Sequence, residues 1–589
     1  MLGSFFSLRK SRRTFRLIQK HYKRKAKSLD ESTREAVLGY LEALRGAIVR
    51  KDSLRAKEMA KELEGASERL MPRNSFDKGR DFIRGIVFAL LVAVLIRTMW
   101  FELYMIPTGS MRPTLKEEDY LVVSKTDYGI NVPLQLDHFH FDETLIKRGS
   151  VIVFNGGGMD ISDVDTVYFY LFPGKKQFVK RLIGKPGDTI YFYGGHLYGL
   201  DREGKEIAEF RTDPWFQKLE HIPFIRFEGK MESDPRGGIV FHQMNLPVAK
   251  LGVNSRGELL DKRGSFADLW GMRHFAMARL LTKLELMMIH PGVEVEEGLL
   301  YLELTHTPSL QGARFPHLGV SHSIIPLKER HLKALSEHMT TCRFVVKDGR
   351  ASRFGWSAKG MDSYLLRIPG IADGIFEMQD GKAYRLPFPK VPILGIFTNG
   401  VTWELPQGHC LYSHTPEMVH DLFNLGIEFL KSFQPVQKYQ RAKPSRYAYF
   451  RDGDLYLLGA PIIAKGDPVL ESYLAKEVQK PNAFIDRGAP TVEEIQKFGL
   501  KLPEKMYLAL GDNHAMSADS REFGFVPEKN LKGGVSFLFS PPGQRWGRPL
   551  QPKIQHWTIP NVTVWALFAL ASLSSSLYFR RKMKKPLKF

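Results

Sequence analysis

The chain has 589 residues, which corresponds to roughly four domains at about 150 residues each. Hydrophobic residues make up 43% and charged residues 25%, a balance that excludes both a disordered chain and a membrane protein with many spans. The 85 Lys and Arg against 64 Asp and Glu give a net charge of +21, which favours an acidic partner such as nucleic acid or an anionic membrane surface. The place of this charge along the chain distinguishes the two.

Residues 1–81 are predicted to form a basic, partly helical region on the cytoplasmic side. The first 29 residues hold ten Lys or Arg and no Asp or Glu. Residues 82–106 follow as a predicted transmembrane helix, because 25 residues exceed the roughly 20 that a bilayer requires. The uninterrupted apolar part, Gly85–Ile96, has only 12 residues, so Arg84 and Arg97 would have to reach the membrane surface. A buried helix of a soluble domain is the alternative.

A second uncharged segment, residues 557–579, is predicted to be a transmembrane helix near the C-terminus. Its several serines leave a shallow helix, or one packed against protein, as the alternative. Residues 580–589 form a basic tail, and residues 1–84 hold 22 Lys or Arg against 11 Asp or Glu, so the positive-inside rule places both termini in the cytoplasm. We therefore expect a protein of the cell membrane with two spans and everything between them on the extracytoplasmic side. An anionic membrane surface explains the basic clusters better than nucleic acid does, because the sequence contains no recognisable nucleic-acid-binding motif.

Three short motifs follow the first span, and each means little alone. In Ile106–Leu115, a Pro-Gly turn would expose Ser110. Phe178–Asp188 joins a strand, with adjacent Lys and Arg on opposite faces, to a second Pro-Gly turn. Leu510–Pro527 is a dense polar loop between apolar runs. A turn serine, a solvated lysine and a structural or calcium-type loop would explain them one at a time.

In combination and in this order, the motifs resemble those of bacterial type I signal peptidases, the serine–lysine proteases that remove signal peptides from exported proteins. Leu95–Glu102, before the first motif, and Arg148–Phe154, between the first two, strengthen the resemblance. It covers roughly residues 82–200 and 445–540, well under half of the chain. The resemblance implies a mostly β catalytic body.

By similarity, Ser110 is the nucleophile and Lys180 is its general base. A lysine with the ordinary pKa of about 10.4 is neutral in fewer than one molecule in a thousand at pH 7. The implied mechanism therefore requires apolar surroundings that lower the pKa of Lys180. The resemblance also implies that the hydroxyl of Thr108 and the backbone N–H of Ser110 hold the oxyanion.

Four further residues are implied to support this pair. Ser517 would orient the catalytic lysine, Asp519 and Arg521 would form a bracing salt bridge, and Arg181 would join their network. The family commonly has Arg-Asp-Asn where this chain has His514-Ala-Met, which puts part of the bracing in doubt. His514 is an alternative base, although the lysine already fills that role.

The middle of the chain is much longer than the resemblance requires. From Asp188 to Gly511 the numbering advances by 323, so residues 205–440 are predicted to be an inserted α+β region. The catalytic domain would then consist of residues 107–204 and 441–548.

Local patterns predict several elements in and around the insert. Gly-containing turns between apolar runs predict three hairpins: Tyr191–Tyr198, Phe376–Tyr384 and Tyr449–Tyr456. Apolar periodicity predicts three helices: Phe266–Ile289, Lys328–His338 and Glu417–Phe433.

Cofactor and metal signals are weak. The two cysteines, Cys342 and Cys410, are too few for a four-cysteine zinc site, and the sequence leaves open whether they form a disulfide. The histidines lack metal-ligand spacing, and Gly184–Gly187 lacks the spacing of a phosphate-binding loop. We expect neither a metal nor a cofactor.

The resemblance thus implies a membrane-bound serine endopeptidase that cleaves signal peptides at Ala-x-Ala-like sites. Its expected partners are exported preproteins, membrane lipid and the secretion translocon, and not nucleic acid. A membrane-tethered binding or assembly factor with an inactive peptidase body is the alternative. A self-cleaving repressor with the same Ser–Lys body is disfavoured, because no DNA-binding domain is recognisable.

Overall fold

The computed structural model divides into two compact units, residues 1–97 with 561–589, and residues 98–560. It describes residues 2–584 apart from 73–74, 160, 162–163, 169–171, 224–229, 234–238, 244–245, 254–258, 261–265, 294, 296–299, 312–316, 355–365, 369, 387–400, 426–445, 481–482, 515–516 and 544.

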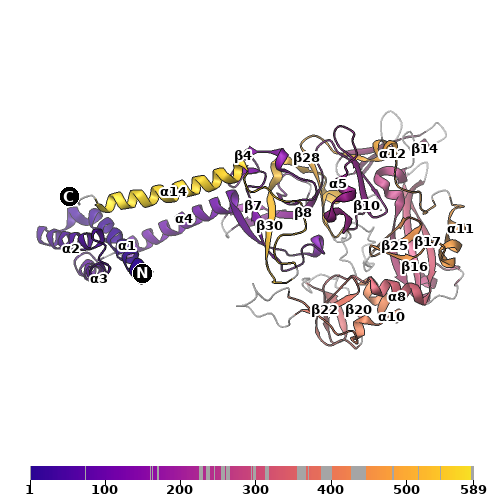
Figure 1. The fold of residues 1–589 in the computed structure, drawn as a ribbon, viewed down its shortest axis with the longest axis horizontal. Helices are drawn as coiled ribbons and strands as arrows, with labels where there is room; N and C mark the ends of the chain where they lie inside the picture. The colour runs from indigo at the N-terminus through magenta and orange to yellow at the C-terminus, as the bar shows by residue number, and fades with distance from the viewer. Residues whose placement is uncertain are drawn as a thin grey trace. The chain divides into compact units, whose positions relative to one another are not determined.

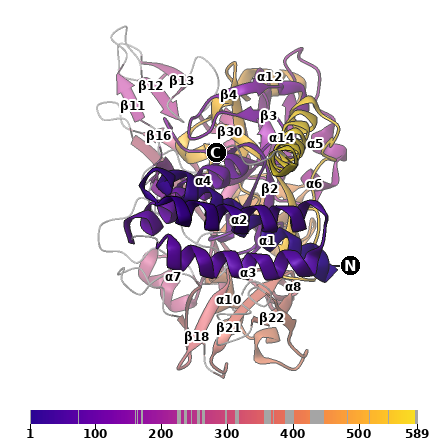
Figure 2. The same cartoon turned by 90° about the vertical axis from the view of Figure 1, so that its left-hand side faces the viewer.

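The first unit contains a bundle of three helices, α1 (Leu2–Lys25), α2 (Glu31–Val49) and α3 (Ser53–Leu70), which lie alongside one another (Figure 2). Aspartates cap two of them: Asp30 accepts from the backbone of Thr33 at the start of α2, and Asp52 caps α3 in the same way. Apolar residues at helical spacing on all three helices form one buried core.

Two long apolar helices, α4 (Ser75–Met99) and α14 (Ile559–Lys584), are also present (Figure 1). Their apolar stretches, Phe82–Met99 and Ile559–Arg581, have mean hydropathies of 2.1 and 1.6 and are long enough to cross a membrane. Only 6% of the first stretch and none of the second is buried, so neither fits the alternative of a helix covered by protein.

The predicted first helix, residues 82–106, is too long at its C-terminal end. The helix ends at Met99, and Phe101–Met105 forms strand β1. The reason is pairing: β1 lies antiparallel to β2 (Tyr120–Ser124), which takes up the backbone hydrogen bonds that a helix would have used.

The second unit is mostly β, as expected for the catalytic body. Its central sheet has seven strands in the order β1-β2-β30-β5-β8-β28-β29. Beyond β1 and β2, these are β5 (Val151–Asn155), β8 (Gln177–Gly184), β28 (Met506–Leu510), β29 (Val526–Pro527) and β30 (Leu531–Ser540). Strands from both ends of the unit alternate in this sheet, so the motifs come close together although contacting residues of the first and third, Gly109 and Asn513, are 404 positions apart.

Smaller elements surround this sheet. The strands are β3 (Gly129–Asn131), β4 (His138–Phe141), β6 (Asp165–Tyr168), β7 (Phe172–Lys175), β9 (Thr189–Tyr193), β10 (His196–Leu200) and β27 (Leu500–Lys501). The short helices are α5 (Glu209–Thr212), α6 (Pro214–Gln217), α12 (Val492–Phe498) and α13 (Ser520–Phe523).

Two six-stranded sheets occupy most of the middle of the chain. One has the order β17-β16-β15-β24-β25-β26 and the other β20-β19-β18-β21-β22-β23. The first comprises β15 (Phe275–Leu281), β16 (Leu300–Gln311), β17 (His317–Leu327), β24 (Arg446–Arg451), β25 (Asp454–Leu457) and β26 (Ala460–Ile463). The second comprises β18 (Phe344–Lys347), β19 (Arg350–Arg353), β20 (Leu366–Arg367), β21 (Gly374–Gln379), β22 (Lys382–Leu386) and β23 (Trp403–Glu404).

These sheets share one apolar core with α8 (Glu329–Glu337), α10 (Pro416–Asn424) and α11 (Pro468–Glu477), and Figure 1 shows α8 and α10 beside β20 and β22. A further sheet contains β11 (Lys230–Ser233), β12 (Ile239–Gln243), β13 (Leu246–Val253) and β14 (Leu259–Leu260). Strands β24, β25 and β26 follow residue 440 and complete a sheet that begins at residue 275. The boundary at residue 440, between the insert and the second part of the catalytic domain, stays a prediction.

The local predictions in this region have mixed outcomes. All three hairpins are confirmed, as β9–β10, β21–β22 and β24–β25, and α8 confirms the helix predicted at 328–338. The helix predicted over Phe266–Ile289 is wrong: a 3-10 helix (Phe266–His274), β15 and the short α7 (Lys283–Ile289) occupy it. Helix α10 covers the start of the third predicted helix, whose remainder after residue 425 lies outside the described residues. Cys342 and Cys410 are not bridged.

The middle region should owe its stability to this shared core. Leu302 of β16 is fully buried, so Leu302→Ala should lower the free energy of unfolding by about 2–5 kcal/mol. Leu284 of α7 is 68% exposed, and Leu284→Ala should change it by less than about 0.5 kcal/mol. Urea titration followed by circular dichroism measures both. Equal destabilisation by the two variants would contradict this assignment of the core.

Candidate active site

The serine of the first motif and the lysine of the second meet in the structure. Ser110 lies in a 3-10 turn, Gly109–Met111, shortly after β1, and Lys180 lies in the middle of β8. Lys180 Nζ is 2.9 Å from Ser110 Oγ, within hydrogen-bond distance. The Thr108 hydroxyl donates to the same oxygen at 3.4 Å. The exposed fractions of Ser110 and Lys180 are 9% and 4%, so both lie inside the body.

The turn that carries Ser110 is held by the third motif. The backbone N–H of Arg112 donates to Gly109 O at 3.1 Å and closes the turn. The backbone N–H of Asn513 donates to Ser110 O at 3.1 Å, and its side-chain amide donates to Gly109 O at 3.4 Å. Asn513 therefore fixes the backbone on both sides of the Ser110 side chain. Its place in the third motif was the one sequence signal that pointed to this role.

Lys180 has the environment that the implied mechanism requires. Its strand lies between β5 and β28, and the fully buried Ile152 is its direct neighbour on β5. Burial lowers the pKa of Lys180 from 10.5 to about 8, against the opposing effect of Asp519 and Asp512. At pH 7 about a tenth of the molecules would then carry a neutral amine.

The predicted salt bridge between Asp519 and Arg521 is present. Arg521 Nε lies 2.9 Å from Asp519 Oδ1, and both side chains are almost fully buried. Asp519 also accepts from the backbone N–H of Gly511 at 2.9 Å, and Arg521 donates to His514 O at 2.5 Å. The pair thus ties the two ends of the polar loop together.

Arg181 forms a separate ion pair and does not join the Asp519–Arg521 pair. Its Nε and Nη2 donate to the two carboxylate oxygens of Asp512 at 2.6 and 2.7 Å, and its Nη1 donates to Gly149 O at 2.6 Å. Arg181 is fully buried, so this bidentate pair anchors the start of the third motif to β8.

Ser517 lies beside the site but is not bonded to Lys180. It is fully buried, and its hydroxyl has no hydrogen-bond partner among the described residues. A Cβ atom added to Gly511 would lie 2.2 Å from Ser517 Oγ and 2.5 Å from Ser110 O, so the glycine allows the serine to approach the nucleophile turn. The predicted bond between Ser517 and Lys180 is absent, and the hydrogen bond of the amine goes to Ser110 Oγ.

His514 does not have the surroundings of a general base. Its ring is buried, and Nδ1 accepts from the backbone N–H of Ile222 at 2.8 Å. Burial and the nearby Arg521 hold its pKa well below the ordinary value, so the ring is neutral and structural.

One other cluster, outside this site, has metal-ligand geometry among the described residues. Ligand atoms of His290, Glu303 and His322 lie within 4.8 Å of one another. Glu303 Oε1 contacts both imidazoles, but Arg279 binds Oε2 of the same carboxylate. The guanidinium already neutralises this carboxylate and would repel a divalent cation. We interpret the cluster as a network of contacts around the Glu303 carboxylate and not as a metal site.

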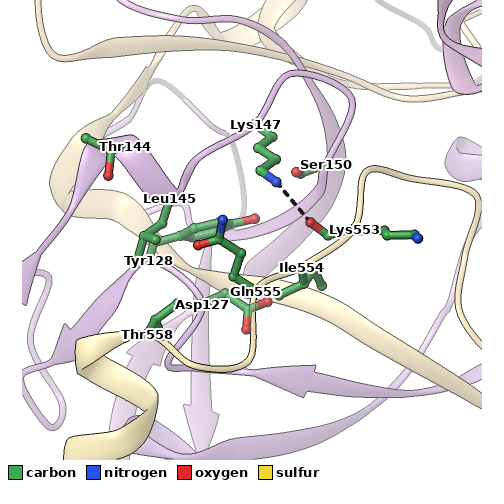
Figure 3. Close-up of a pocket in the computed structure, with 10 residues that line it drawn as sticks. All are labelled: Asp127, Tyr128, Thr144, Leu145, Lys147, Ser150, Lys553, Ile554, Gln555 and Thr558. Carbon is green, nitrogen blue, oxygen red and sulfur yellow. Dashed lines mark hydrogen bonds between the residues drawn. The ribbon is translucent and has the colours of Figure 1, made fainter.

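Figure 3 shows a small pocket next to the segment that leads into α14. Its volume is about 20 Å³, enough for one water molecule and too small for a peptide side chain. Among its lining residues, Lys147 Nζ donates to Lys553 O at 3.2 Å, and burial raises the pKa of Asp127 to about 7. It is not a substrate site.

Burial of the Lys180 amine should cost folding stability. At pH 7 the ammonium form predominates in both states but is desolvated only in the folded one, so Lys180→Met should raise the free energy of unfolding by about 1–3 kcal/mol. The gain should be complete below pH 8 and vanish as the pH approaches 10.5, where the unfolded lysine also loses its proton.

Denaturant titrations at pH 7 and at pH 10 measure this difference, with Lys333→Met at a side chain that is 65% exposed as the control. A destabilised Lys180→Met variant at pH 7 would show that the amine is not under desolvation stress.

Comparison with known proteins gives one consistent answer. The family described as "Signal peptidase, peptidase S26" matches residues 79–224 and 450–540, which hold all seven predicted site residues. Signal peptidase I of Rickettsia massiliae (strain Mtu5) is 28% identical over 181 residues, which are 29% of this chain and 59% of the relative. Signal peptidase I T of Bacillus subtilis (strain 168) is 35% identical over 126 residues, 21% of this chain and 49% of the relative.

Signal peptidase I of Bacillus amyloliquefaciens is 32% identical over 151 residues, 26% of this chain and 62% of the relative. The chain thus spans about half to three-fifths of the length of these curated relatives. The expected resemblance to bacterial type I signal peptidases is confirmed, and it lies in the two segments that build the seven-stranded sheet and its site.

Proposed function

We propose that this protein is a membrane-bound signal peptidase that cleaves N-terminal signal peptides from exported preproteins at Ala-x-Ala-like sites. The observation that carries the proposal is the 2.9 Å contact between Ser110 Oγ and Lys180 Nζ in a buried site. A serine hydroxyl is a poor nucleophile until a neighbouring base takes its proton, and a desolvated lysine amine is such a base.

In the proposed reaction, neutral Lys180 accepts the proton of Ser110 Oγ while this oxygen attacks the scissile carbonyl carbon. The oxyanion that forms would be held by the backbone N–H of Ser110 and by the hydroxyl of Thr108, which rotates away from its resting contact with Ser110 Oγ. Lys180 then returns the proton to the leaving amine, and an ester on Ser110 remains. Water, deprotonated by Lys180, attacks this ester, and Lys180 returns the proton to Ser110 Oγ as the signal peptide leaves with a free carboxylate.

The supporting residues are proposed to hold this geometry. Asp519 and Arg521 fix the polar loop, and Arg181 fixes its first carboxylate, so the loop can hold the nucleophile turn. The unbonded hydroxyl of Ser517 is proposed to accept a hydrogen bond from the Lys180 ammonium after proton transfer. A buried ammonium requires such an acceptor.

The two apolar helices are proposed to anchor the enzyme in the cell membrane. Both α4 and α14 have the length and exposure of a span. Basic residues flank the N-terminal end of the apolar stretch in α4 and the C-terminal end of that in α14. We propose that both termini are cytoplasmic, with residues 98–560 on the extracytoplasmic side. Preproteins held in the bilayer by their signal segments, delivered by the translocon, would meet the site there. The substrate and lipid partners follow from this placement.

Cleavage of a purified precursor with an Ala-x-Ala site tests the proposal. Full-length wild type in detergent should release the mature protein, and Ser110→Ala and Lys180→Ala should each lose at least about 10³-fold in kcat/KM. Ser336→Ala, at a buried serine of α8, should match the wild type. Wild-type activity retained by Ser110→Ala would refute the mechanism. A folded wild type that leaves such precursors intact in membranes of living cells would favour the binding-factor alternative.

A further inference from the structure

Charged residues from the middle of the chain bind the loop that follows the nucleophile turn. Glu377, on β21, is fully buried and accepts hydrogen bonds from three cations. Arg112 Nη2 lies 2.9 Å from its carboxylate and Arg343 Nε lies 3.0 Å away, and Lys116 Nζ binds the other oxygen. Arg112 and Lys116 belong to residues 112–119, which follow the turn of Ser110 and are called the nucleophile loop below. Arg343 and Glu377 come from the predicted insert.

Arg112 connects this cluster to the nucleophile. It stands two residues after Ser110, and its backbone N–H closes the turn by donating to Gly109 O at 3.1 Å. Its guanidinium bridges two carboxylates, binding Glu117 at 2.8 Å through Nε and Glu377 at 2.9 Å through Nη2. A displacement of this guanidinium would therefore be transmitted to the turn that carries Ser110.

The five charged groups depend on one another. Three cations and two carboxylates are present, and none of the five side chains is more than 8% exposed. Charges removed from water in this way must be compensated by their partners. Among the described residues of this cluster, loss of the Glu377 charge would leave three cations with one carboxylate, Glu117, and their mutual repulsion would act on the loop through Arg112 and Lys116.

A cavity lies next to this cluster. Its volume is about 430 Å³, and it is lined by Arg112 and Lys116 from the loop, by Met378 and Asp380 from the middle region, and by Asn513 from the third motif. The cavity is therefore lined jointly by the loop after Ser110, by the third motif and by the middle region.

We propose that Glu377 is a positioning residue for the nucleophile turn, which it holds through Arg112. The inserted region is then part of the catalytic apparatus and not an independent module. This inference rests on the proposed signal peptidase function.

Steady-state cleavage by the full-length protein in detergent tests the inference through Glu377→Gln. The amide keeps the shape and an acceptor oxygen, but it removes the charge. We expect kcat to fall about 10- to 100-fold, as for a misplaced reactive group, with KM within about threefold of the wild type. The matched control is Glu303→Gln, at a carboxylate of the same region that is 1% exposed and bound by Arg279, and its kcat should stay at the wild-type value.

A second variant separates positioning from general damage. Lys116→Met combined with Glu377→Gln leaves two cations and one carboxylate, so the surplus charge of the cluster is again +1, and kcat should return to within about threefold of the wild type. Wild-type kcat in Glu377→Gln, an equal loss in Glu303→Gln, or a folded double variant without recovery would each overturn the inference. A wild type that cleaves no precursor would instead refute the proposed function itself.

Discussion

The rest of the structure depends on one constraint: the amine of Lys180 must be shielded from solvent beside the hydroxyl of Ser110. Burial lowers the pKa of Lys180 to about 8, while the carboxylates of Asp519 and Asp512 act in the opposite direction. Each carboxylate is bound by its own buried arginine, Arg521 and Arg181, which limits its pull on the amine. The site can thus hold acidic residues close to the lysine without returning its pKa to the ordinary value.

The fold brings distant segments to this amine through strand order. Strand β8 lies between β5 and β28, so the second motif is inserted between segments from opposite ends of the unit. The long middle region packs back onto the same body: Arg451 of β24 donates to Gly194 O in the β9–β10 turn at 2.7 Å, and Glu377 of β21 holds the nucleophile loop. Because the entropic cost of closing a loop grows only slowly with its length, such an insert is tolerable. Here its contacts also stabilise the site.

Much of this could be predicted from the sequence, and the failures have physical reasons. The family resemblance that the motifs carry implied that Ser110 lies next to Lys180, and short hairpin patterns were reliable because both strands and the turn are local. The Phe266–Ile289 pattern misled, because its centre, β15, is buried on both faces and such an apolar run does not differ from a buried helix by periodicity. The ion-pair partners of Arg181 and Glu377 could not be predicted from local sequence patterns, because these partners lie 331 and 265 positions away.

The pH dependence of kcat/KM for cleavage of a soluble precursor tests the central claim most directly. Activity of the wild type should rise tenfold per pH unit at acidic pH and level off above an apparent pKa near 8, because only the neutral Lys180 amine can accept the serine proton. A rise that continues to about pH 10, as for a lysine with its ordinary pKa, or a midpoint near 6.5, as for a histidine base, would contradict the account.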